Sequence, residues 1–186
     1  EDLIDSYRTR IQENARHNNP LYAAMVHSLD EGVGTILDKI DELNIAERTI
    51  VFFVSDNGGA VKEYDDKLPK RTDNYPLRMW KATPYEGGIR VPFIAYCPGR
   101  RENRGTVCEE PVSTIDFYPT ILEMAGVSRE KITKPGLDGV SLVPILDNPS
   151  DTLPREALFW HYPHYHTKGA TPYSIIIKRE YKLIEF

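Results

Sequence analysis

The 186-residue sequence has few cysteines, no long hydrophobic run and no excess of basic residues. No apolar stretch approaches the roughly 20 residues that a membrane-spanning helix needs, so no membrane span is expected. The net charge is -5 at pH 7 and no basic stripe is visible, which argues against nucleic acid as a partner.

The two cysteines, Cys97 and Cys108, are too few for a disulfide framework. No spacing of cysteine and histidine is typical of a zinc site. Cys97 ends an apolar run, so we expect it to be a small core residue. Whether it pairs with Cys108 stays open at this point.

The rest of the composition is that of a globular protein, with 40% hydrophobic and 27% charged residues. The length is sufficient for one domain with a hydrophobic core. The sequence opens on Glu-Asp-Leu-Ile-Asp rather than on Met, and it stops on apolar residues. We therefore expect a piece of a longer protein.

A helix followed by a strand is predicted in the first third of the sequence. Asn19 can cap a helix, Pro20 is favoured in its first turn, and apolar residues then recur at three- and four-residue steps. This spacing predicts an amphipathic helix of about 24 residues, packed on one face and closed by Asn44. The apolar run 50–54 predicts a strand buried on both faces inside a parallel sheet.

The remaining sequence alternates loops with short elements. Residues 60–80 are charged and without periodicity, which predicts a loop of functional, lid-like or disordered type. A capping box at Ser113 and Asp116 predicts a helix that ends at Gly126. Strands are predicted at residues 91–96, 109–112, 157–160, 173–178 and 181–186, the last two joined by the tight link Arg179-Glu180. Helices and strands in this order indicate an α/β fold.

Polar residues follow the first strand directly, in the order Ser55-Asp56-Asn57-Gly58-Gly59. Ligands of open α/β sheets bind beyond the carboxyl ends of the strands. Asp56 and Asn57 carry hard oxygen ligands of the kind that Ca²⁺ or Mg²⁺ prefers. The same residues also make an ordinary turn, and this stretch alone does not choose between the two interpretations.

Together with residues 81–92, Lys-Ala-Thr-Pro-Tyr-Glu-Gly-Gly-Ile-Arg-Val-Pro, this motif closely resembles the arylsulfatase-like type I sulfatases of the alkaline phosphatase superfamily. The resemblance covers nearly the whole chain, with further matches at residues 22–30 together with Gly34, and at 116–120, 137–142, 159–165 and 182–184. The run 159–165 resembles a subgroup with members that act on sulfated carbohydrates.

The resemblance implies a fold and two domains. The fold is an alkaline-phosphatase-like α/β sandwich with a mainly parallel sheet flanked by helices, plus a small C-terminal antiparallel sheet. Residues 1–156 would be the C-terminal half of the catalytic domain, and residues 157–186 the start of the antiparallel-sheet subdomain. The family is mostly periplasmic, lysosomal or secreted, so a periplasmic or secreted location is expected.

The resemblance also assigns site residues. Asp56 and Asn57 would supply two ligands to a Ca²⁺ ion, with Mg²⁺ as the other candidate, and Lys81 would bind the sulfate during catalysis. His161 and His164 would line the substrate pocket. The plainer interpretations are a solvated loop lysine for Lys81 and partly buried structural residues for the histidines.

The family's nucleophile is a formylglycine made from Cys or Ser in Cys/Ser-x-Pro/Ala-x-Arg, and that motif is absent here. Residues 97–101 have Cys and Arg at this distance, but Gly99 stands in place of Pro or Ala, so we reject them. The nucleophile is expected upstream of Glu1, and the chain alone is expected to be inactive.

The function predicted from the sequence is Ca²⁺-dependent hydrolysis of a sulfate ester, on a sulfated carbohydrate. One alternative is a phosphate or phosphonate ester hydrolase of the same superfamily, which a comparison of sulfate and phosphate esters would separate. Another is a non-catalytic relative that binds a glycan, which would lack the upstream nucleophile.

Overall fold

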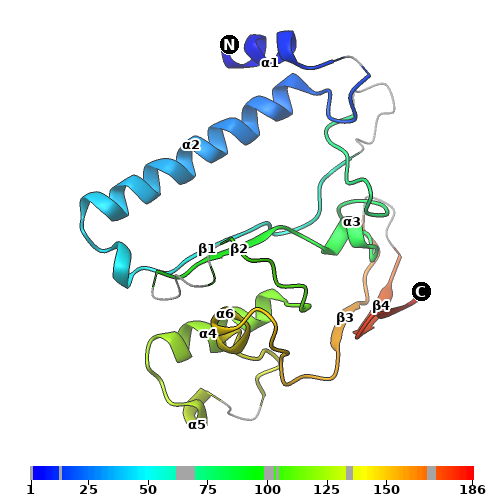
Figure 1. Ribbon diagram of the computed structural model, residues 1–186. Coiled ribbons are helices and arrows are strands. Elements are labelled where there is room, and N and C mark those ends of the chain that lie inside the picture. The colour runs from blue at the N-terminus through cyan, green and yellow to red at the C-terminus, as the bar shows by residue number, and fades with distance from the viewer. Residues whose placement is uncertain are drawn as a thin grey trace. The chain divides into compact units, whose positions relative to one another are not determined.

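The computed structural model describes residues 2–12, 14–61, 70–98, 103, 105–132, 136–166 and 171–186 (Figure 1). The chain divides into two compact units. The first unit comprises residues 1–96, 162–174 and 186, and the second comprises residues 97–161 and 175–185. The predicted boundary at residue 156 stays a prediction.

The first unit begins with helices α1 (Asp2–Arg10) and α2 (Pro20–Glu42). Asn19 caps α2 as predicted, because its side-chain oxygen accepts a hydrogen bond from the Tyr22 amide at 3.0 Å. Asn44 follows the helix with φ +54°, the left-handed conformation that closes many helices. The helix bounds are therefore set by local signals.

Strand β1 (Val51–Val54) follows α2 through the 3-10 turn η1 (Ala46–Arg48), and it pairs with β2 (Phe93–Tyr96). The α/β class is confirmed, but this pair is antiparallel, with Val51 opposite Tyr96, whereas the sequence predicted a parallel neighbour. An apolar run reports how far a strand is buried and not its direction, and the long connection between β1 and β2 allows either direction.

The apolar face of α2 lies opposite this strand pair. A cavity of about 440 Å³ lies between α2 and the two strands, lined by residues such as Leu29, Val33, Phe53 and Ile94. A helix of 23 residues is about 35 Å long, while a four-residue strand covers only about 13 Å. The exposed large apolar residues on α2 and β2 include Met25, Val26, Leu29, Ile36, Leu37, Ile94 and Tyr96.

The second unit holds the short helices η3 (Thr114–Asp116), α4 (Phe117–Met124), α5 (Arg129–Ile132) and α6 (Val143–Asp147). The predicted capping box at Ser113 is present, and Gly126 ends the helix with φ +83°. The predicted strand 109–112 is wrong, because these residues are irregular. Pro111 lacks the amide that a sheet would need there. The buried apolar residues that the structure describes in this unit include Ile132, Leu142, Ile145, Leu153, Leu158 and Ile175.

The C-terminal strands β3 (Leu158–Tyr162), β4 (Tyr173–Lys178) and β5 (Tyr181–Glu185) form a three-stranded sheet in that order. The two-residue link Arg179-Glu180 joins β4 to β5 as predicted, with φ +54° at Arg179. Such a short link requires antiparallel strands.

No disulfide joins Cys97 to Cys108, and both side chains are partly exposed, so Cys97 is not the core residue that was expected. Within the parts of the chain that the structure describes, no helix is long and apolar enough to cross a membrane.

Candidate functional site

The predicted ligand residues lie in a compact turn directly after β1. The Ser55 hydroxyl donates to the Asn57 carbonyl oxygen at 2.9 Å, and the Ser55 amide donates to the Pro92 carbonyl oxygen at 3.3 Å. The Asn57 side-chain amide donates to the Gly58 carbonyl oxygen at 3.1 Å. The ordinary-turn interpretation is therefore correct as far as the backbone is concerned, and the remaining question is what the side-chain oxygens can bind.

The oxygens of Asp56 and Asn57 are available to a cation. Asp56 is exposed, and Asn57 turns its amide nitrogen toward the backbone, which leaves Oδ1 on the other side. Neither the Asp56 carboxylate nor Asn57 Oδ1 accepts a hydrogen bond from the described residues. Two hard oxygens of this kind fit Ca²⁺.

Two oxygens do not complete a calcium site, since Ca²⁺ takes about 6–8 oxygen ligands. Across the described ranges, no group of three or more His, Cys, Asp or Glu side chains is placed to hold a metal ion. The residues present fit part of a calcium site, and the other ligands have to come from elsewhere.

Lys81 is held directly against the turn that carries Asp56 and Asn57. The Lys81 amide donates to the Gly59 carbonyl oxygen at 3.1 Å, and the Gly58 amide donates to the Gly88 carbonyl oxygen at 3.0 Å. Helix α3 (Glu86–Ile89) contains Gly88, so both halves of the second motif contact the first. The structure therefore brings the two predicted motifs together, although more than 20 residues separate them in sequence.

Glycine is needed where these segments cross. A Cβ atom at Gly58 would lie 1.8 Å from the Gly87 carbonyl oxygen. A Cβ atom at Gly87 would lie 2.1 Å from the Met79 carbonyl oxygen. Both distances are far below a van der Waals contact, so the glycines allow two backbones to approach closely.

Asn74 is a residue of this site that the sequence interpretation missed. Its side-chain amide donates to the carbonyl oxygens of Gly59 at 3.0 Å, Met79 at 3.1 Å and Gly87 at 3.0 Å. The only signal in the sequence is that Asn74 is the one asparagine of the loop 60–80. Its partners could not be read from that position.

The neighbouring Asp73 anchors the same loop. Its carboxylate accepts hydrogen bonds from Lys70 Nζ at 2.5 Å and from the Tyr75 amide at 2.8 Å. The bond from Lys70 and then the bond from Tyr75 hold the pKa of Asp73 below its ordinary value. Asp73 is therefore ionised at neutral pH and holds residues 70–75 together around Asn74.

The predicted substrate histidines are both exposed. His161 lies on β3, and the His164 ring contacts the Tyr162 ring edge-on, with centroids 5.6 Å apart. Their role in a substrate pocket stays a prediction.

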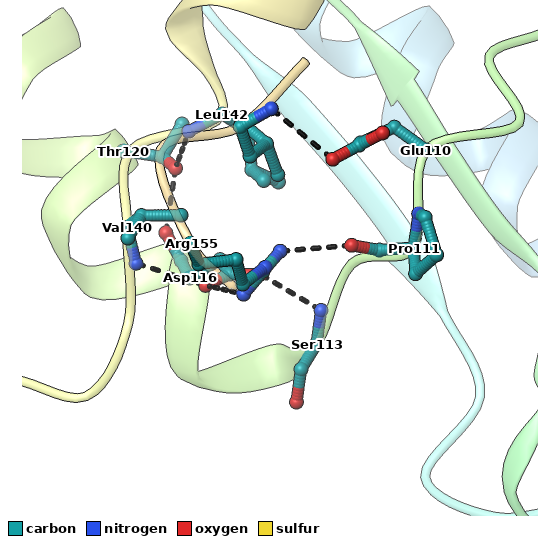
Figure 2. Close-up of polar contacts among 9 residues, drawn as sticks. Glu110, Pro111, Ser113, Asp116, Thr120, Val140, Leu142 and Arg155 are labelled. Atoms are coloured by element: carbon teal, nitrogen blue, oxygen red, sulfur yellow. Dashed lines mark hydrogen bonds and ion pairs between the residues drawn. The ribbon is translucent and has the colours of Figure 1, made fainter. Parts of the chain in front are cut away.

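A second polar cluster surrounds Asp116, which the sequence indicated only as part of a capping box (Figure 2). Asp116 is fully buried and accepts hydrogen bonds from the amides of Ser113 at 2.8 Å and Val140 at 2.9 Å. Two guanidinium nitrogens of Arg155 donate to it at 2.8 Å each. Since its oxygens are already satisfied, this cluster is structural and offers no ligand. The sequence interpretation missed Arg155.

Comparison with known proteins identifies the motifs. Residues 1–127 match the family model described as Sulfatase, and residues 79–186 match the one described as N-sulphoglucosamine sulphohydrolase, C-terminal. A protein of Formosa agariphila named Sulfatase is 37% identical over 184 residues, which are 94% of this chain and 32% of that protein. Steryl-sulfatase of Mus musculus is 36% identical over 145 residues, which are 76% of this chain and 22% of that protein.

A solved structure agrees with these matches. Ps i-CgsB, determined in complex with k-i-k-neocarrahexaose, matches with a TM-score of 0.76 at 27% identity, over 100% of this chain and 38% of that chain. The chain thus spans about a third or less of the length of the relatives that it matches.

Proposed function

The chain belongs to the sulfatase family of the alkaline phosphatase superfamily, and from this we propose that the full-length protein hydrolyses sulfate esters at a Ca²⁺ site that includes Asp56 and Asn57. The observation that carries the proposal is the hydrogen bond from the Lys81 amide to the Gly59 carbonyl oxygen. This hydrogen bond joins the loop that carries the Lys81 ammonium group to the turn that carries the two oxygen ligands, Asp56 and Asn57.

Each residue has a role that suits its chemistry. Cleavage of a sulfate ester builds negative charge on the transferring and leaving oxygens, and a divalent cation supplies charge stabilisation there. The oxygens of Asp56 and Asn57 hold that cation in place. The Lys81 ammonium binds a sulfate oxygen and stabilises the same charge from a fixed position.

We propose that the nucleophile is the family's formylglycine and that it lies outside these 186 residues. The residues of this chain then act by binding and orientation. Since the turn and the Lys81 loop share backbone hydrogen bonds, the sulfate group is held in one orientation relative to the cation.

The proposed substrate class is a sulfated carbohydrate. The match to the C-terminal part of N-sulphoglucosamine sulphohydrolase covers His161 and His164, and the solved structure that resembles the whole chain holds a carrahexaose. We propose that the two exposed histidines contact the sugar. Steryl-sulfatase of Mus musculus is 36% identical to this chain, nearly as much as the sulfatase of Formosa agariphila at 37%. Sequence identity therefore does not choose between a carbohydrate and a steroid substrate, and the substrate class needs its own test.

The metal assignment is tested by Asp56→Ala in the full-length protein. This variant should lose Ca²⁺ binding at the site, measured by calorimetry, and should lose turnover of sulfate esters. The matched control is Asp38→Ala, which removes an exposed carboxylate on α2 and should change neither quantity. Near-normal turnover of Asp56→Ala would contradict the assignment.

The role of Lys81 is tested by Lys81→Ala. Turnover of a sulfate ester should fall by about 10²-fold or more, the order expected when one preorganised charge partner is removed. Lys131→Ala on α5 is the control, since Lys131 is an exposed lysine of the second unit. If both variants keep the wild-type rate, Lys81 is the solvated loop lysine of the plainer interpretation.

The substrate class is tested by comparing kcat/KM for a sulfated oligosaccharide, a steroid sulfate and a phosphate monoester. We expect the sulfated oligosaccharide to be the best substrate. Preference for the phosphate ester would favour the phosphoesterase alternative. Binding of the oligosaccharide without turnover of any ester would favour a glycan-binding protein.

A further inference from the structure

The Asn74 side chain contacts three segments that meet at the proposed site. Its amide nitrogen lies 3.0 to 3.1 Å from carbonyl oxygens of Gly59, Met79 and Gly87. Gly59 ends the turn of Asp56 and Asn57, Met79 lies two residues before Lys81, and Gly87 belongs to α3. An asparagine amide has two hydrogens, so one of them is shared between two of these oxygens.

The Gly59 carbonyl oxygen links the two functional segments through Asn74. It accepts one hydrogen bond from the Asn74 amide and another from the Lys81 backbone amide at 3.1 Å. A Cβ atom at Gly59 would lie 2.4 Å from Asn74 Oδ1, so the carboxamide packs directly against this residue. The Asn74 side chain is therefore in direct contact with the last residue of the turn.

The loop of Lys81 needs such support, because two of its residues have unfavourable backbone conformations. Met79 has φ +66° and Ala82 has φ +68°. This left-handed conformation costs a residue with a Cβ atom about 1–2 kcal/mol of free energy, so such residues keep it only when other contacts stabilise it. The hydrogen bond from Asn74 to the Met79 carbonyl oxygen is one of those contacts.

We propose that Asn74 is the positioning residue of this site, whose carboxamide holds the Asp56–Asn57 turn and the Lys81 loop in one arrangement. This inference rests on the proposed function, because the proposed function is what assigns the cation to the turn and the sulfate to the Lys81 loop. In this arrangement Asn74 would contact neither ligand itself. It acts through the backbone oxygens of Gly59 and Met79, and a loss of its donors should weaken cation and sulfate binding together.

The test is Asn74→Asp in the full-length protein. Aspartate has nearly the same shape, but its ionised carboxylate has no hydrogen to donate and places negative charge against three carbonyl oxygens. The dissociation constant for Ca²⁺ is measured by calorimetry without sulfate. The inhibition constant of inorganic sulfate is measured at saturating Ca²⁺. Both should rise by about tenfold or more, the usual effect of losing a group that orients a ligand.

The matched control is Asn44→Asp, the same change at the exposed end of α2, and it should leave both constants within about twofold of wild type. The direct variants give a second comparison. Asp56→Ala should act mainly on Ca²⁺ and Lys81→Ala mainly on sulfate, whereas the Asn74 variant should change both. A residue with a purely structural role would lower the melting temperature and leave both constants of the folded protein unchanged.

Asn74→Ser keeps one hydroxyl donor and serves if Asn74→Asp does not fold. Its constants should rise by less than those of a variant without donors. Unchanged Ca²⁺ and sulfate constants in a folded Asn74 variant would overturn the inference and leave the proposed function intact. If the wild-type protein binds neither Ca²⁺ nor sulfate, the proposed function fails, and the inference fails with it.

Discussion

At the scale of single residues, the ion pair of Asp116 and Arg155 is the most buried ion pair among the residues that the structure describes. The Asp116 side chain is 0% exposed and that of Arg155 is 10% exposed. Arg155 also donates to the Pro111 carbonyl oxygen at 2.9 Å. The ion pair therefore connects the segment before β3, which contains Arg155, to Asp116 at the start of α4. A buried carboxylate that loses its partner pays for desolvation without compensation.

Arg155→Met should therefore destabilise the protein by about 3–5 kcal/mol, because Asp116 would stay buried without its counter-ion. The measurement is the free energy of unfolding in urea. Lys178→Met is the control, since Lys178 pairs with Glu156 at 3.3 Å but both side chains are largely exposed. It should cost less than about 1 kcal/mol. If the two variants lost the same free energy of unfolding, burial of the ion pair would not determine how much its removal destabilises the protein.

The residue scale also shows the limit of sequence interpretation. The capping role of Asp116 was predicted, because Ser113 lies three residues before it. The bond to Arg155 was not, because the two residues are 39 positions apart. Asn74 was missed for the same reason, since its partners Gly59 and Gly87 are 15 and 13 positions away.

At the scale of elements, α2 follows its sequence signals closely, and its surroundings do not. Its start at Pro20 and its closure at Asn44 were both predicted. The helix packs against α1, where the Tyr7 hydroxyl and His27 Nδ1 are 3.0 Å apart. Its apolar face borders a cavity that residues of β1 and β2 line on the other side. Periodicity thus located the face without showing what lies opposite.

The cap of α2 gives a prediction for this element. Asn19→Ala should destabilise the first turn by about 1 kcal/mol, because the Tyr22 amide loses its acceptor. Faster hydrogen exchange of the first turn is the readout. Asn19→Asp retains an acceptor and should protect these amides as in wild type, which separates the cap from the bond that Asn19 donates to the Lys70 carbonyl oxygen. Equal exchange in Asn19→Ala and wild type would refute the role of the cap.

At the scale of the whole molecule, the proposed function assigns only part of an active site to the 186 residues. In that proposal they would supply two oxygen ligands and one sulfate-binding lysine, and their relatives are about three times as long or longer. Ca²⁺ needs about 6–8 oxygens, so binding by this chain alone should be weak.

The 186-residue chain produced by itself is therefore expected to show no turnover of a sulfate ester above background. The assay compares it with the full-length protein and with the same chain carrying Asp56→Ala. Turnover by the chain that disappears in the Asp56→Ala variant would mean that these residues contain a complete site.

The sequence by itself determined the features that depend on a few neighbouring residues. These are the ends of α2, the capping box of Ser113, the hairpin link at Arg179 and the two motifs that identify the family. Local signals suffice there because the hydrogen bonds involved span only a few positions. Only the tertiary structure decided the antiparallel pairing of β1 with β2 and the contacts of Asn74, Arg155 and Lys81. Their partners lie on distant segments, so packing rather than local sequence brings them within hydrogen-bonding distance.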